Sequence, residues 1–302
     1  MNLLQTLLNS RLGVGLALGL GRSIPPSVGY RLADWIARII ASQHRSRIVQ
    51  AVQANQWVVS GGQVSRGQLD TLTLNTFRHT GRCLYDLYHN ESNPAAMRAI
   101  VHLSREFFEA IENAKREQRG LLMVCPHLSN FDLVGRVIAL SGTDVQVLSY
   151  PQPAGGYRWQ NEMRRRYGVN MTPMSLAAMR QATECLKNQG VVLTGVDRPW
   201  PDSNYQPMFF GRPAALPASH IRLALKTGVQ ILVVASHMLP DGSYNILAAP
   251  PIEMQRHADL QTEIVQNQEA VLRVIEAWIR QTPEQWAMFY PVWPEALSEI
   301  PK

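Results

Sequence analysis

The sequence is short of cysteine, of charge and of long apolar runs. Three cysteines occur in 302 residues, at positions 83, 125 and 185, and they lack metal-ligand spacing. Neither a disulfide framework nor a metal site is therefore expected, and unpaired thiols favour a reducing compartment such as the cytosolic side of a membrane. Charged residues make up 17% of the chain and hydrophobic residues 46%, a balance that permits a sizeable core and excludes intrinsic disorder.

The amino terminus is apolar but too interrupted to span a bilayer. The apolar residues between Leu3 and Leu20 are broken by Asn9, Ser10 and Arg11, whereas a spanning helix needs about 20 mostly apolar residues. A secretory signal is also disfavoured, because its charge should precede the apolar stretch and not fall within it.

Acidic residues are almost missing from the first fifty positions, which contain six arginines and one acid, Asp34. This segment carries +5 of the net charge of +6, and the pI is about 9.4. We expect residues 1–24 to lie on an anionic membrane surface, and an ordinary packing helix with a solvated basic face is the alternative. No nucleic-acid partner is expected, because the arginines are interleaved with leucine and isoleucine.

Helical and strand-like patterns divide the chain into two parts. Residues 25–118 show mostly helical spacing, whereas short apolar runs alternate with helical stretches from residue 119 onward. The runs at 121–125, 145–150, 191–196, 229–236 and 244–248 predict strands, and the segments 130–141, 157–167, 175–188, 217–227 and 260–280 predict helices. This alternation predicts an α/β fold with a mixed, mostly parallel sheet flanked by helices. We expect one domain, residues 25–302, whose helical part is 25–118 and whose α/β core is 119–302.

A histidine and an aspartate follow the first predicted strand, in Pro126-His-Leu-Ser-Asn-Phe-Asp132. His127 falls at the carboxyl end of that strand, where ligands bind in open α/β sheets. Asp132 falls in the first turn of the next helix, where its carboxylate could hold one imidazole nitrogen and leave the other to act as a base. The spacing alone says little, since about 0.6 such matches are expected from composition. A buried or capping histidine is the alternative.

Two further segments carry candidate substrate-binding residues. The stretch 157–167 contains four arginines, and the forks of Arg164 and Arg165 suit a phosphate or carboxylate group, although a solvated basic face is an equal alternative. Asp197 and Arg198 end another predicted strand at the same edge of the sheet. They could bind substrate or form a structural pair with each other.

The order of these segments resembles the bacterial lipid A biosynthesis lauroyl/myristoyl acyltransferase family, within the wider lysophospholipid acyltransferase group. The matching pieces are residues 125–132, 164–166, 195–198, 209–211, 218–234 and 278–286. The ending around residues 283–293 is more similar to the phosphatidylinositol mannoside acyltransferases. Ser129 stands where the family often has glycine, and the family's aromatic-acidic pair is here Phe131-Asp132. The ending at residues 287–290 is less basic than in typical lipid A enzymes, which leaves the acceptor open.

The resemblance implies transfer of a fatty acyl group from acyl carrier protein or coenzyme A to a hydroxyl of a membrane lipid, with no bound cofactor and no metal. It implies that His127 is the base, that Asp132 is its partner, and that Arg164 or Arg165 holds a charged substrate group. A peripheral position on the cytoplasmic face of the inner membrane follows from it. A lysophospholipid or ornithine-lipid acyltransferase is an alternative, and so is a non-catalytic lipid-binding protein of the same fold.

Overall fold

The structure is a computed structural model that describes residues 19, 21–151, 155–166 and 168–301. Its named helices are α3 (Pro26–Ala41), α4 (Arg47–Val59), α5 (Arg66–His89), α6 (Pro94–Ile100), α7 (Arg105–Arg116), α8 (Phe131–Leu140), α9 (Gly155–Arg166), α10 (Leu176–Lys187), α11 (Ser219–Thr227) and α12 (Leu260–Gln281), followed by the short 3-10 helices η1 (Pro283–Gln285) and η2 (Pro294–Glu299). Its strands are β1 (Val101–His102), β2 (Leu121–Cys125), β3 (Val145–Ser149), β4 (Asn170–Pro173), β5 (Val191–Gly195), β6 (Met208–Phe209), β7 (Arg212–Pro213), β8 (Ile231–Met238) and β9 (Tyr244–Ala248).

Seven strands form one sheet in the order β1-β9-β8-β2-β5-β3-β4, and β6 and β7 form a separate hairpin. All neighbours in the large sheet are parallel except β8 and β9, which are antiparallel. This confirms the predicted mixed, mostly parallel sheet.

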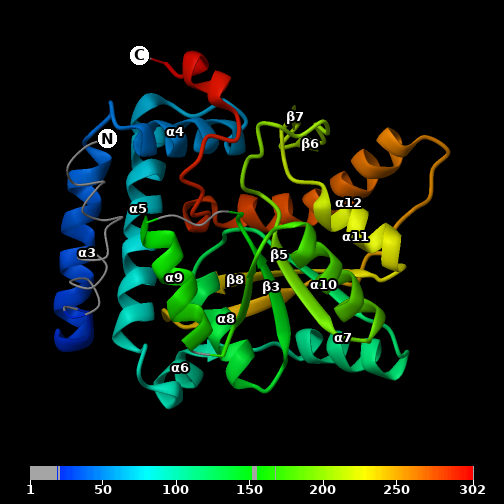
Figure 1. Ribbon diagram of the computed structural model, residues 1–302. Helices are drawn as coiled ribbons and strands as arrows, with labels where there is room; N and C mark the ends of the chain where they lie inside the picture. The colour runs from blue at the N-terminus through cyan, green and yellow to red at the C-terminus, as the bar shows by residue number, and fades with distance from the viewer. Residues whose placement is uncertain (1–18, 20, 152–154, 167, 302) are drawn as a thin grey trace.

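Helices cover both faces of this sheet (Figure 1). Leu122 and Val124 of β2 pack in a cluster with residues of α10, α11 and α12. Leu121 and Met123 of the same strand pack in a second cluster with residues of α5, α6, α7, α8 and α9. Because successive side chains of a strand point to opposite faces, a strand covered on both faces is apolar at every position, as β2 is.

The helices α3, α4 and α5 lie beside the sheet (Figure 1) and have a small core of their own. The 24-residue helix α5 begins with a capping box between Ser65 and Gln68 and also contributes Cys83 and Leu87 to the core under the sheet. Most of the expected membrane segment, residues 1–24, lies outside the described residues. Within the described part of the chain, none of the helices combines the length and the apolar character that a bilayer crossing requires.

Candidate active site

The pairing of β2 with β5 places His127 and Asp197 beside each other. Cys125 at the end of β2 is in register with Gly195 at the end of β5, and the Val196 amide continues the pairing by donating to the Cys125 carbonyl at 3.2 Å. One residue, Pro126, separates Cys125 from His127, and one residue, Val196, separates Gly195 from Asp197. Since neighbouring strands lie about 5 Å apart, the two side chains meet at the carboxyl edge of the sheet.

Asp197 holds His127 at two points. The Nδ1 atom of His127 lies 2.6 Å from Oδ1 of Asp197, and the His127 backbone N–H donates to Oδ2 at 2.8 Å. Asp197 is fully buried, whereas 31% of the imidazole is exposed. An ionised carboxylate only accepts hydrogen bonds, so Nδ1 carries the hydrogen and the neutral ring keeps its lone pair at Nε2.

Trp286 completes the surroundings of this carboxylate. Its indole Nε1–H donates to Oδ2 of Asp197 at 2.8 Å, and the ring itself is buried. Burial raises the pKa of Asp197, but the charge and hydrogen bonds of His127 and the hydrogen bond of Trp286 outweigh it, so the pKa lies below its ordinary value. The carboxylate is therefore ionised at neutral pH, as a partner for an imidazolium should be.

Asp132 is held by another residue, Arg164 of α9. The Nε and Nη2 atoms of Arg164 lie 2.6 Å and 2.8 Å from the two carboxylate oxygens of Asp132, and Nη1 donates to Oδ1 of Asn161 at 2.7 Å. Burial raises the pKa of Asp132, but the charge and hydrogen bonds of Arg164 outweigh it and keep the pKa below its usual range. The imidazole contact expected from Asp132 is thus made by Asp197, and the guanidinium expected to bind substrate is occupied by Asp132.

The carboxyl-terminal segment clamps the loop that carries His127. The Ser129 amide donates to the Gln285 carbonyl at 2.7 Å, and the Ala287 amide donates to the His127 carbonyl at 2.8 Å. Ser129 has a positive φ of 49°, which turns the chain into α8, where the side chain of Asn130 accepts from the Leu133 amide at 3.3 Å. His127 therefore stands on backbone that is fixed on both sides.

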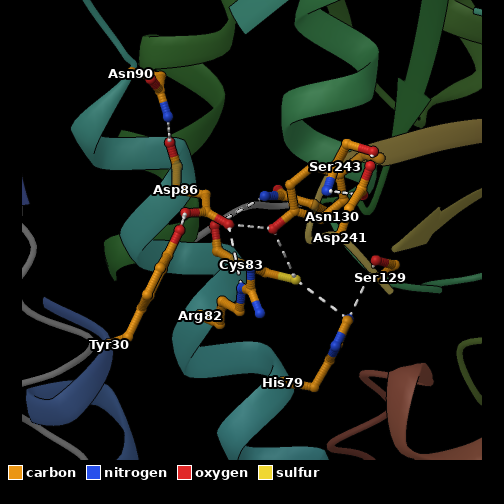
Figure 2. Close-up of polar contacts among 11 residues, drawn as sticks. Tyr30, His79, Arg82, Cys83, Asp86, Asn90, Ser129, Asn130, Asp241 and Ser243 are labelled. Carbon is orange, nitrogen blue, oxygen red and sulfur yellow. Dashed lines mark hydrogen bonds and ion pairs between the residues drawn. The ribbon is translucent and has the colours of Figure 1, made fainter. Parts of the chain in front are cut away.

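Polar side chains of α5 contact this loop at Ser129 and Asn130 (Figure 2). The Nε2 atom of His79 lies 3.1 Å from Oγ of Ser129 and 3.3 Å from Sγ of Cys83. The Nδ2 atom of Asn130 donates to the Cys83 carbonyl at 2.9 Å. Burial lowers the pKa of His79 to about 4 and raises the pKa of the Cys83 thiol to about 12, so both groups are neutral at physiological pH.

Gly195 lies directly against the imidazole ring of His127. A Cβ atom added to Gly195 would lie 3.3 Å from Cε1 of His127 and 3.9 Å from Nε2. Because contacts near 3.3 Å are tighter than most Cβ contacts in proteins, any side chain here would push against the ring. Glycine at this position leaves the imidazole undisturbed.

The remaining predicted binding residues lie in different surroundings. Arg165 is exposed and donates from Nε to the Met171 carbonyl at 3.0 Å. The guanidinium of Arg198 lies between the rings of Tyr150 and Tyr290, 3.9 Å and 4.0 Å from their centroids. The sequence thus placed Arg198 at the correct edge of the sheet but did not reveal the two rings that hold it.

The aromatic pair Phe209 and Phe210 belongs to the core. Phe209 is fully buried and Phe210 nearly so, and both rings contact Trp286 and Trp293. Their burial favours a role in the core over the lining of an acyl-binding slot. No group of three or more possible metal ligands occurs among the residues described.

The sequence signal for Asp197 was its position directly after the predicted strand 191–196, at the edge of the sheet where His127 was also expected. Nothing in the sequence identified Trp286 as a hydrogen-bond donor to Asp197, because Trp286 and Asp197 are 89 positions apart.

Comparison with known proteins agrees with the segments that suggested the family. Residues 4–295 match the model of the bacterial lipid A biosynthesis acyltransferases. The phosphatidylinositol mannoside acyltransferases of Mycobacterium tuberculosis (strain ATCC 25618 / H37Rv) and Mycolicibacterium smegmatis are 24% and 26% identical to this chain over 185 residues. These matches cover 60% of this chain but only 56% and 59% of the two relatives. Because the family model covers nearly its whole length, the chain belongs to the bacterial lipid A biosynthesis acyltransferase family.

Proposed function

We propose that the protein is an O-acyltransferase that moves a fatty acyl group from a thioester to a hydroxyl of a membrane glycolipid. The observation that carries the proposal is the His127–Asp197 pair, in which a buried carboxylate holds Nδ1 of a partly exposed imidazole. The family and the relatives are all named as acyltransferases, which supports the same class of reaction.

His127 acts as the general base in this reaction. Its Nε2 atom takes the proton of the acceptor hydroxyl while the oxygen attacks the thioester carbonyl carbon. The tetrahedral intermediate then breaks its carbon–sulfur bond, and the imidazolium gives its proton to the leaving thiolate. Asp197 fixes the tautomer and stabilises the imidazolium, as the acid does in other base-plus-acid pairs.

The donor in this proposal is an acyl thioester of coenzyme A or of acyl carrier protein, and it is a substrate and not a resident cofactor. A glycolipid acceptor is favoured because the curated relatives are phosphatidylinositol mannoside acyltransferases. A lysophospholipid or ornithine lipid would require the same base. Comparing membrane lipids with and without the gene distinguishes these acceptors, because each leaves a different under-acylated lipid.

We place the reaction at the cytoplasmic face of the inner membrane, with the protein bound peripherally to anionic lipid. The outer side of α3 supports this position, since Trp35, Ile36 and Ile39 are exposed there, 60% in the case of Trp35. Arg31 and Arg45 are exposed close by in the sequence. An apolar stripe next to cations is the pattern of a helix that lies in a membrane interface.

The direct test is His127→Ala, assayed with acyl-coenzyme A and lipid vesicles by mass spectrometry of the lipid product. We expect turnover to fall by at least about 10³-fold, because the base is removed, while the fold is retained. His44→Ala, at an exposed histidine, is the matched control. Full activity of His127→Ala refutes the mechanism. A wild-type protein that binds vesicles without any turnover would instead be a lipid-binding protein.

A further inference from the structure

Ser129 has a backbone conformation that residues with a side chain rarely adopt. Its φ of 49° lies in the left-handed region, where glycine is unstrained and serine is not. The residue is buried in the loop that carries His127, two positions further along the chain. A strained conformation of this kind persists only where its surroundings hold it in place. The contacts that hold Ser129 therefore bear on the position of His127.

One of these contacts comes from helix α5. The Oγ atom of Ser129 lies 3.1 Å from Nε2 of His79, which is a hydrogen-bonding distance (Figure 2). The same helix holds the next loop residue one turn further on, since Nδ2 of Asn130 donates to the Cys83 carbonyl at 2.9 Å. Helix α5 thus holds two consecutive residues of the loop.

The conformation of Ser129 links His127 to helix α8. On the side of His127, the Ser129 amide donates to the Gln285 carbonyl at 2.7 Å. On the other side the chain continues into α8, whose apolar residues pack in the core under the sheet. A change in φ at Ser129 would alter the angle between these two parts. Because α8 is held by its packing, the part that carries His127 would be displaced.

We infer that Ser129 and His79 are positioning residues for His127. The hydrogen bond between them holds the left-handed turn, and the turn sets where the imidazole lies relative to Asp197. This inference rests on the proposed function, in which Nε2 of His127 is the general base. Since both residues act through His127, their loss should lower the rate of the chemical step and leave substrate binding unchanged.

The kinetic test is a double-mutant cycle on the full-length protein, assayed with acyl-coenzyme A and lipid vesicles. We expect His79→Leu and Ser129→Ala each to lower kcat by about 10-fold with KM unchanged, because a small displacement of a reacting group is costly. The double variant should lose no more than either single variant, since both substitutions remove the same hydrogen bond.

Three further variants separate positioning from a general loss of structure. Ser129→Gly should keep more activity than Ser129→Ala, because glycine adopts a positive φ without strain. His79→Gln should recover part of the kcat that His79→Leu loses, because an amide can form a hydrogen bond with a hydroxyl. Thr80→Val in the same helix is the matched control and should keep full kcat, since among the described residues its buried hydroxyl has no hydrogen-bond partner.

A second measurement needs no turnover. Long-range proton–nitrogen NMR spectra of the imidazole groups report which nitrogen of His127 carries the hydrogen, and the Asp197 contact favours Nδ1. We expect His79→Leu to increase the share of the form with hydrogen on Nε2, because a displaced ring bonds Asp197 less well. Thr80→Val should have the spectrum of the wild type.

The outcomes decide between the two proposals. If the wild type is active, an unchanged kcat in His79→Leu, or losses that add up in the double variant, overturns the inference. If His79→Leu does not fold, Ser129→Ala decides alone, and wild-type kcat in that variant overturns it. If the wild type transfers no acyl group, the proposed function fails, and an unchanged His127 spectrum in His79→Leu then overturns the positioning role as well.

Discussion

Arg164 holds the carboxylate of Asp132 through two hydrogen bonds, of 2.6 Å and 2.8 Å, and so joins the first turn of α8 to α9. Only 11% of the Arg164 side chain and 21% of the Asp132 side chain are exposed. A largely buried charge pair of this kind is costly to break by removing one partner, because the other charge then stays buried without compensation. The pair therefore holds α8 and α9 together beside the loop that carries His127.

The first prediction separates the roles of the two aspartates. Asp197→Asn should lower kcat/KM by about 10³-fold, because an amide group facing Nδ1 favours the tautomer that has its hydrogen on Nε2. Asp132→Asn should mainly lower the free energy of unfolding, by about 2 kcal/mol, because the charge of Arg164 is left uncompensated. Steady-state kinetics and urea denaturation measure the two effects.

Adding Arg164→Gln to Asp132→Asn provides the control, since removal of both charges should restore part of the lost stability. The assignment of Asp197 fails if Asp197→Asn keeps full activity while Asp132→Asn loses activity without loss of stability.

The second prediction concerns Gly195, which lies against the imidazole of His127. Gly195→Ala should lower kcat about 10-fold or more, because its Cβ would lie 3.3 Å from Cε1 of His127 and displace the ring. The free energy of unfolding should change little, since Gly195 is exposed. Gly135→Ala in α8 is the matched control, because nothing lies within 4 Å of its added Cβ and alanine favours a helix. Equal kcat in the wild type and Gly195→Ala would contradict the close contact.

The third prediction is a pH dependence of stability. Burial lowers the pKa of His79 to about 4 in the folded protein, whereas the unfolded value is near 6.5. Between these values the unfolded chain binds a proton that the folded protein does not, so the free energy of unfolding falls as the pH decreases from 6.5 to 4. His79→Gln should reduce this slope by up to about 1.4 kcal/mol per pH unit.

Chemical denaturation at several pH values measures the slope. Ser129→Ala should keep it, because burial, the largest cause of the shift, remains when the hydrogen-bond partner is removed. An unchanged slope in His79→Gln would show that His79 is not the group that titrates.

The fourth prediction tests the membrane surface assigned to α3. Trp35→Ser and Ile39→Ser should each weaken binding to anionic vesicles by about 10-fold, because each removes exposed apolar area that would enter the interface. Leu176→Ser, at a leucine that is 83% exposed on α10, is the control. Flotation of the purified protein with phosphatidylglycerol vesicles is the measurement, and binding that does not change in the α3 variants would place the contact elsewhere.

The sequence predicted the strands that are long and apolar, and it missed the short polar ones. Both β2 and β9 were predicted with the bounds that the structure has, because an apolar run between polar segments marks a buried strand. In contrast, β4 is an edge strand with the sequence Asn-Met-Thr-Pro, and its burial on one side leaves no such pattern. The two-residue strand β1 is too short to produce any periodicity.

The sequence indicated where the candidate residues lie, but not which of them contact each other. His127, Asp132, Arg164, Asp197 and Arg198 all lie near the edge that the pattern indicated. Which of them meet depends on the lateral order of strands, and a sequence does not show that β5 neighbours β2 across 70 residues. Asp132 was expected to be the partner of His127 because their spacing is visible in the sequence. The contact between His127 and Asp197 depends on the pairing of β2 with β5, which the sequence does not show.

Pro126 and Val196 each occupy the single position between a paired strand end and the His127–Asp197 pair. Successive side chains of an extended chain point to opposite sides, so one inserted residue at either place would turn His127 or Asp197 away from its partner. Positions 126 and 196 should therefore tolerate substitutions more readily than insertions or deletions. The distance between the two side chains is set by the number of residues that follow each strand.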